Sequence, residues 1–255
     1  VDVGGTFVDA VLHTKNGEGT LLKFPKQWLK RERSPFGEFN SPQPSYDLLY
    51  STTLTLNRLL SGKVPRIGLV VTRGFHTILE TARLPSNHDD KILPGRLIPL
   101  ELVKEVQGRI NYKGKETEPL CREEIVELSN WFVSQNVKVI VVALINSYAQ
   151  PKHELKVANY LREGNRNLLV IPSTDVVSEM REYERTLAAA INGCITPIFE
   201  DDLGQLIAAI PSRPSQIHIM QSNGGIANLD SPRKLPIKTI LSGPAAAVNY
   251  VKKLT

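Results

Sequence analysis

An acidic residue, two glycines and a hydroxyl residue lie together at the start of the chain, in Asp2-Val3-Gly4-Gly5-Thr6. Because glycine has no Cβ, the backbone N–H groups at Gly4 and Gly5 can approach an anion closely. The Thr6 hydroxyl can bond a phosphate oxygen, and the Asp2 carboxylate is a ligand that hydrated Mg²⁺ prefers. The segment predicts a phosphate-handling turn, with Asp2 and Thr6 as candidate catalytic residues and Asp2 as the candidate metal ligand.

The residues after this turn indicate a β-hairpin. Residues 7–12 alternate as a half-buried strand does. This separates the turn from the glycine-rich loops of P-loop and Rossmann proteins, in which the phosphate lies at a helix N-terminus. An ordinary Gly-Gly hairpin turn has the same residue types, so these five residues leave both interpretations open.

The rest of the chain alternates strand-like and helical stretches, which predicts an α/β architecture with a largely parallel sheet. Strands are expected at residues 21–24, 66–72, 137–145, 168–171 and 217–220. Helices are expected at residues 47–60, 74–83, 122–135, 152–163 and 180–208, and after Gly243. Residues 85–120 lack such a pattern, so we expect them to form an insertion outside the sheet.

Polar and small residues follow several of these strands, where an α/β sheet binds its ligands. Each cluster alone could be a simple turn, but together they favour a nucleotide or anion cleft. The candidate nucleotide or phosphate residues are Gly4, Gly5, Thr6, Ser222, Asn223, Gly224, Gly225, Ser242 and Gly243. The candidate substrate residues are Thr52, Thr53, Asn57, Thr72, Arg181 and Glu182.

Two of these groups have an equally simple structural explanation. Thr52, Thr53 and Asn57 could cap a helix instead of lining a site. Charges from Arg181 to Arg185 are spaced to form ion pairs along a helix surface, or to act as an acid/base cluster.

Composition limits the classes of function. The 255 residues carry a formal charge of +5, and the densest basic patch, Lys26–Arg33, favours a solvated loop over a nucleic-acid surface. The two cysteines show no metal-ligand spacing and make no disulfide framework, and the lack of such a framework is typical of a reducing cytoplasm. No apolar run is long enough to span a membrane. Because Val1 begins within a strand, we expect the chain to be a piece of a larger protein.

Six motifs in this order resemble the hydantoinase A/5-oxoprolinase family. They are Asp2–Phe7, Ser51–Thr53 with Asn57, Thr72–Phe75, Arg181–Thr186, Met220–Gly225 and Leu241–Ala245. The resemblance implies a ribonuclease-H-like (actin-like ATPase) mixed sheet with flanking helices and an inserted irregular segment at about 85–120. It also implies an N-terminal hydantoinase/oxoprolinase-type domain over residues 1–165, and the start of the core domain over 166–255. The family commonly has His-Gly-Thr-Thr where this chain has Tyr50-Ser51-Thr52-Thr53.

The same resemblance implies an ATP- and magnesium-dependent enzyme that activates a carbonyl oxygen. The leading expectation is hydrolysis of a cyclic amide such as a hydantoin, 5-oxoproline or a lactam. A ketone carboxylase subunit and a non-catalytic actin-like nucleotide-binding protein stay open. We expect a partner subunit of the hydantoinase B type, an oligomer, and neither nucleic acid nor membrane as a partner. The family's second phosphate motif should follow Ala247 and is absent from this chain, so we expect the fragment alone to be inactive.

Overall fold

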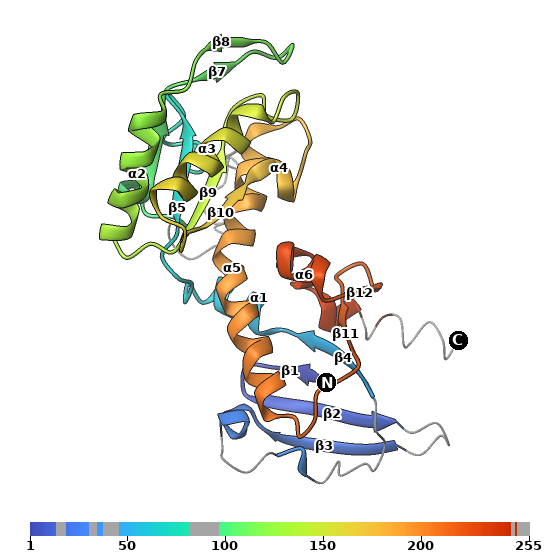
Figure 1. Ribbon diagram of the computed structural model, residues 1–255. Coiled ribbons are helices and arrows are strands. Elements are labelled where there is room, and N and C mark those ends of the chain that lie inside the picture. The colour runs from blue at the N-terminus through green and yellow to red at the C-terminus, as the bar shows by residue number, and fades with distance from the viewer. Residues whose placement is uncertain (14–18, 31–34, 38–45, 82–96, 246–247, 249–255) are drawn as a thin grey trace. The chain divides into compact units, whose positions relative to one another are not determined.

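Figure 1 shows the computed structural model of the chain, which describes residues 1–13, 19–30, 35–37, 46–81, 97–245 and 248. The chain forms two compact units. Unit 1 consists of residues 1–61 and 195–255, and unit 2 consists of residues 62–194. The long helix α5 (Glu182–Ala209) contributes residues to both. The domain boundary expected from the sequence at about residue 165 stays a prediction.

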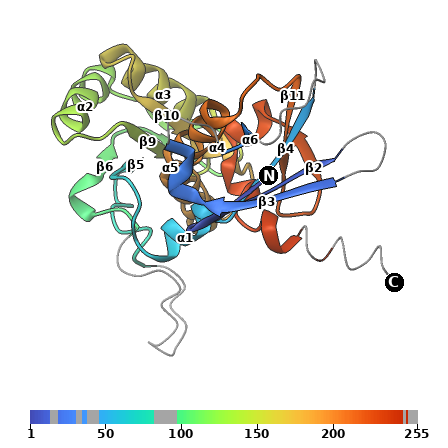
Figure 2. The ribbon, with the colours of Figure 1, turned by 90° about the horizontal axis from the view of Figure 1, so that it is seen from below.

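Unit 1 is built on a mixed six-stranded sheet in the order β12-β11-β4-β1-β2-β3. Its strands are β1 (Asp2–Val3), β2 (Phe7–His13), β3 (Gly19–Pro25), β4 (Asp47–Thr52), β11 (Gln216–Met220) and β12 (Ile226–Asn228). Strands β1, β4 and β11 run parallel, whereas β2, β3 and β12 are antiparallel to their neighbours. The hairpin of β2 and β3 is visible side by side in both views (Figure 1, Figure 2).

One face of this sheet is buried beneath the second half of α5. Val3, Val8 and Tyr50 are fully buried in a cluster with Phe199 and Leu203 of the helix. Strands of this sheet alternate buried and more exposed residues, as expected when one face packs on a core. Short helices complete the unit: η1 (Lys26–Lys30), α1 (Leu54–Leu60), α6 (Asp230–Lys234) and η4 (Pro236–Thr239).

Unit 2 contains a parallel sheet in the order β10-β9-β5-β6. The strands are β5 (Gly68–Thr72), β6 (Val103–Val106), β9 (Val139–Ala143) and β10 (Leu169–Pro172). The helices are η3 (Leu100–Leu102), α2 (Arg122–Ser134), α3 (Lys152–Gly164) and α4 (Ser173–Val176), and β7 (Arg109–Ile110) pairs with β8 (Glu116–Glu118) in a separate hairpin. Helices α2 and α3 lie side by side (Figure 1, Figure 2).

Helices approach this parallel sheet closely because small residues lie at the contacts. Every residue of β5 and β9 is buried, as is typical of a parallel sheet covered by helices. A Cβ on Gly68 would lie 2.4 Å from the Phe132 ring of α2, and one on Gly193 of α5 would lie 2.8 Å from Val141. The expected burial of the strand at 137–145 beside the strand at 67–71 is confirmed.

Three sequence predictions about elements are wrong. Residues 47–60 form strand β4 and then α1, because Leu48, Tyr50 and Thr52 are buried at alternate positions between β1 and β11. Residues 74–81 form turns, and 82–83 lie outside the described residues. The placement of all of 85–120 outside the sheet is corrected by β6, which pairs with β5 from Leu69 to Thr72.

Candidate functional site

The turn between β1 and β2 in unit 1 leaves open space at its second glycine. The Gly4 N–H closes the turn by donating to the Phe7 carbonyl at 2.9 Å, whereas Gly5 and Thr6 are exposed. A Cβ on Gly5 would meet only the Asn57 amide nitrogen, at 3.6 Å. The turn therefore has room for a ligand that approaches the backbone.

The junction between β4 and α1 lies directly against this turn. The Thr52 hydroxyl donates to the Val3 carbonyl at 2.8 Å, and its oxygen accepts from the Leu54 N–H at 3.1 Å. Thr53 lies 4.0 Å from the Cβ position of Gly4. Thr52 is thus buried and engaged in holding the two strands, while Thr53 and Asn57 border the turn.

One further small-residue segment reaches the same junction, and the turn after β11 is hydrogen-bonded to that segment. The Ser222 hydroxyl accepts from the Leu241 N–H at 3.0 Å, which ties the turn after β11 to the segment that precedes Gly243. The Ser242 hydroxyl donates to the Thr52 carbonyl at 3.3 Å. A Cβ on Gly243 would lie 3.0 Å from the Thr53 methyl group.

The turn after β11 is itself a tight hairpin loop. The Gln221 N–H donates to the Gly225 carbonyl at 2.8 Å, and the Gly225 N–H donates to the Asn223 side chain at 2.9 Å. Gly224 has a φ of +81°, a conformation that favours glycine.

Sheet topology explains why these distant segments meet. Because β1, β4 and β11 are parallel, their carboxyl ends lie at one edge of the sheet. Gly4, Thr53 and Gln221 each follow one of these ends. The structure therefore groups the predicted residues of unit 1 along one edge, with Gly4, Gly5 and Gly243 around Thr53 and Asn57.

A buried carboxylate beneath this edge was missed by the sequence analysis. Asp202 of α5 accepts hydrogen bonds from Lys26 and Tyr50, and lies 3.3 Å from the Thr52 hydroxyl. Burial and the Asp202 charge raise the pKa of the Tyr50 phenol well above its usual value of 10.0. Tyr50 therefore stays protonated and donates to Asp202. Glu200, Asp201 and Asp202 all lie between Phe199 and Leu203, so the sequence alone does not single out the buried carboxylate.

The remaining predicted substrate residues belong to unit 2. The Thr72 hydroxyl accepts from the Ile145 N–H at 3.1 Å, and Glu182 accepts from the Asn146 N–H at 2.8 Å. Both thus hold the loop that follows β9. Arg181 is exposed with a φ of +99°.

Arg185 shows that part of the charged segment at the start of α5 is buried, in place of the surface ion pairs that were one of the two arrangements predicted. It is fully buried and donates to Glu154 at 2.8 Å and to the Leu144 carbonyl at 2.6 Å. Glu182 also accepts a hydrogen bond from Arg185. This part of the segment is a buried ion-pair network at the carboxyl ends of β9 and β10.

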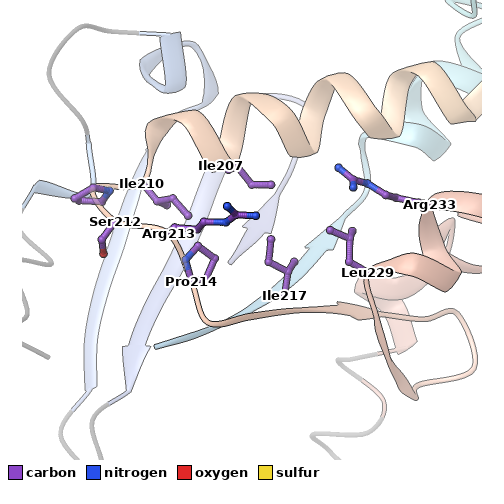
Figure 3. A pocket seen from close by; sticks show the side chains of 9 residues that line it. Ile207, Ile210, Ser212, Arg213, Pro214, Ile217, Leu229 and Arg233 are labelled. Atoms are coloured by element: carbon purple, nitrogen blue, oxygen red, sulfur yellow. The ribbon is translucent and has the colours of Figure 1, made fainter. Parts of the chain in front are cut away.

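A cavity of about 400 Å³ lies elsewhere in unit 1 (Figure 3). Ile207, Ile217 and Leu229 line it, with Arg213 and Arg233 among its polar residues. It lies where the chain enters β11, whereas the grouped turns follow the ends of β1, β4 and β11. The cavity and the phosphate turn are therefore separate features.

The chemistry of the grouped residues fits a nucleotide phosphate and its cation. The space beside the Gly5 backbone is open to a ligand and would be occupied by a Cβ, and Asp2 supplies a carboxylate oxygen. Within the described ranges, no three His, Cys, Asp or Glu side chains gather as a protein-only metal site. No helix among the described residues has the length and apolar character needed to cross a membrane.

Two regions of known proteins match this chain. The hydantoinase/oxoprolinase N-terminal region matches residues 1–164, and the hydantoinase/oxoprolinase region matches residues 185–255. The chain belongs to the hydantoinase/oxoprolinase family. The family resemblance expected from the motifs is thereby confirmed.

Relatives within the family differ in the reactions that their names describe. An uncharacterized protein of Methanocaldococcus jannaschii is 30% identical, over 100% of this chain and 40% of that protein. The gamma subunit of acetophenone carboxylase from Aromatoleum aromaticum is 30% identical, over 80% of this chain and 32% of that subunit. Caprolactamase subunit alpha from Pseudomonas jessenii is 27% identical, over 97% of this chain and 38% of that subunit. The chain thus spans less than half the length of these relatives.

Solved structures of two family members share the fold. The nucleotide-free structure of acetone carboxylase superposes with a TM-score of 0.83 at 22% identity, over 99% of this chain and 39% of that one. The ATP-dependent caprolactamase of Pseudomonas jessenii gives 0.75 at 26% identity, over 97% and 39%. The expected α/β fold of the actin-like ATPase type is confirmed.

Proposed function

We propose that the full-length protein uses ATP and Mg²⁺ to hydrolyse a cyclic amide, by phosphorylating its carbonyl oxygen. The observation that carries this proposal is the grouping of Gly4, Gly5 and Gly243 around Thr53 and Asn57 at one sheet edge. Membership of a family that contains an ATP-dependent caprolactamase supports it. Once the carbonyl oxygen is phosphorylated, water adds to the carbonyl carbon, the ring C–N bond breaks, and the acyl phosphate that remains is hydrolysed to a carboxylate and phosphate. The phosphoryl transfer depends mainly on positioning and on charge.

Each part of the edge has a proposed role. The Gly5 and Thr6 N–H groups and the Thr6 hydroxyl hold the phosphates, and Asp2 holds the cation. When bound, Mg·ATP supplies the phosphoryl group and the charge of the metal. The other proposed nucleotide residues are Gly4, Ser222, Asn223, Gly224, Gly225, Ser242 and Gly243.

The substrate side of the site is proposed more coarsely. Thr53 and Asn57 border the turn in unit 1 and are the proposed substrate contacts there. Thr52 of unit 1, and Thr72, Arg181 and Glu182 of unit 2, stay separate proposals, each within its own unit. Because relatives are named as subunits, we further propose a partner subunit of the hydantoinase B type in a cytoplasmic oligomer.

A ketone carboxylase is the second candidate function. The acetophenone carboxylase gamma subunit is 30% identical to this chain, against 27% for the caprolactamase subunit. The presence of Tyr50-Ser51 where the family commonly has His-Gly also gives this branch some support.

An ATP hydrolysis screen distinguishes these functions. We expect the full-length protein with its partner subunit to hydrolyse ATP at least about tenfold faster with one class of substrate, because only a bound carbonyl can accept the phosphoryl group. The screen compares hydantoins, 5-oxoproline, lactams and small ketones, the last with bicarbonate. Stimulation only by ketones would select the carboxylase branch. ATP binding without stimulation by any compound would favour a non-catalytic nucleotide-binding protein.

A further inference from the structure

Four polar side chains, one of them Asp2, lie at paired positions on four neighbouring strands of the six-stranded sheet. Asp2 of β1 lies opposite Ser51 of β4 and Asp9 of β2, and Asp9 lies opposite Lys23 of β3. Residues that are paired directly across neighbouring strands place their side chains on the same face. Lys23, Asp9, Asp2 and Ser51 therefore form one row, which we call the polar row.

Hydrogen bonds join the polar row into two pairs. The Ser51 hydroxyl donates to an Asp2 carboxylate oxygen at 2.6 Å. The Lys23 ammonium donates to an Asp9 carboxylate oxygen at 2.8 Å. Asp2 and Asp9, the two acidic members, are thus neighbours in the middle of the row.

The polar row lies on the face of the sheet that α5 does not cover. Val8 and Ala10, which flank Asp9 in β2, point the other way and are fully buried. Phe7 and Val11, on the same face as Asp9, are exposed. The side chain of Asp9 is itself 45% exposed, so its carboxylate is accessible from solvent on the face that also carries Asp2.

The charges of the polar row do not balance. Two carboxylates at directly opposite positions of paired strands repel each other. Lys23 compensates Asp9, and Ser51 gives Asp2 a neutral hydrogen bond, so the row keeps a formal net charge of −1. A free nucleotide would meet that negative charge with its own, whereas a divalent cation would neutralise both.

We propose that Asp9 is a specificity-determining residue of the nucleotide site, whose negative charge beside Asp2 makes nucleotide binding depend on a divalent cation. Lys23 offsets part of that charge through its ion pair with Asp9. The inference rests on the proposed function, because it assumes that the Gly4–Thr6 turn binds phosphates. The inference adds a second acidic residue, supplied by β2, to the proposed nucleotide site.

The test compares nucleotide affinity with and without Mg²⁺ in the full-length protein. Affinities of ATP are measured by calorimetry in MgCl₂ and in EDTA, for the wild type, Asp9→Asn and Asp47→Asn. Asp47 is the matched control, because it lies on the same face as Ser51 at the other end of β4. We expect Mg²⁺ to strengthen binding at least about tenfold in the wild type and in the control. In Asp9→Asn this ratio should fall about fivefold or more, with metal-free ATP bound as tightly as before or more tightly.

An Asp9→Asn ratio equal to that of the wild type would overturn the inference and leave the proposed function standing. A wild type that binds no ATP under either condition would overturn both. Lys23→Met supplies a second readout that a purely structural role of Asp9 would not move. Because this change unmasks the Asp9 charge, it should raise the Mg²⁺ dependence, and a lowered dependence would contradict the inference.

Discussion

Replacement of Asp2 by alanine is expected to abolish magnesium-dependent ATP turnover in the full-length protein while the fold stays intact. Asp2 is partly exposed, and its carboxylate accepts a hydrogen bond from Ser51 instead of packing in the core. Charge stabilisation by a catalytic metal is worth several kcal/mol, which corresponds to a rate loss of about a thousandfold or more. The measurement is ATP hydrolysis at saturating Mg²⁺, with circular dichroism to check folding.

Asp47→Ala is the control for the Asp2 experiment, since it removes an exposed carboxylate from the same face of the sheet. It should retain wild-type turnover. Gly5→Ala provides an independent variant, because a Cβ fits the folded turn with its nearest contact at 3.6 Å. It should therefore lose ATP affinity without losing thermal stability. Turnover by Asp2→Ala at the wild-type rate would show that the metal is held elsewhere.

Among the variants proposed for this protein, Arg185→Leu is expected to lower the free energy of unfolding most. The Arg185 guanidinium is fully buried and pairs with Glu154, which is also fully buried. Removal of one partner from a buried ion pair leaves the other charge uncompensated, which costs about 3–5 kcal/mol. Glu154 also accepts from the Leu144 N–H at 2.8 Å and from the Ser173 hydroxyl at 2.6 Å, so the change loosens two loops at the carboxyl edge.

The free energy of unfolding of Arg185→Leu is measured from the first transition of a urea titration. Arg122→Leu is the matched control, because Arg122 bonds Glu163 at 2.7 Å at the surface, with side chains 56% and 46% exposed. Such an exposed pair contributes about 1 kcal/mol or less. A double variant with Glu154→Leu should be more stable than Arg185→Leu alone, because no buried charge is then unpaired. Equal losses of unfolding free energy in Arg185→Leu and Arg122→Leu would contradict the larger contribution expected of the buried pair.

Local pattern was sufficient for the fully buried strand β9 and for the amphipathic helices α2 and α3. The apolar run of β9 and the helical spacing of apolar residues in α2 and α3 identify them without knowledge of their neighbours. The strand β4 could not be identified in this way. Its leucines fit a helix equally well, and its partners β1 and β11 come from opposite ends of the chain. Tertiary pairing, which no local window contains, decided the outcome.

Some residues of the candidate site could likewise be predicted from the local sequence, and others could not. Glycines and hydroxyl residues after strands could be recognised from the sequence, because their position in an α/β fold has a physical meaning. Asp202 and Asp9 could not. Asp202 matters only because α5 carries it beneath Tyr50, 152 residues away. Asp9 matters only because the hairpin register places it opposite Asp2.

The central claim is that the Gly4–Thr6 turn binds the phosphates of ATP, and a structure of the full-length protein with Mg²⁺ and a non-hydrolysable ATP analogue tests it most directly. We expect phosphate oxygens within about 2.7–3.2 Å of the Gly5 or Thr6 N–H groups, and the cation on the Asp2 side of the turn. Phosphates bound away from this turn, for example beside Arg213 in the cavity at the start of β11, would contradict the account.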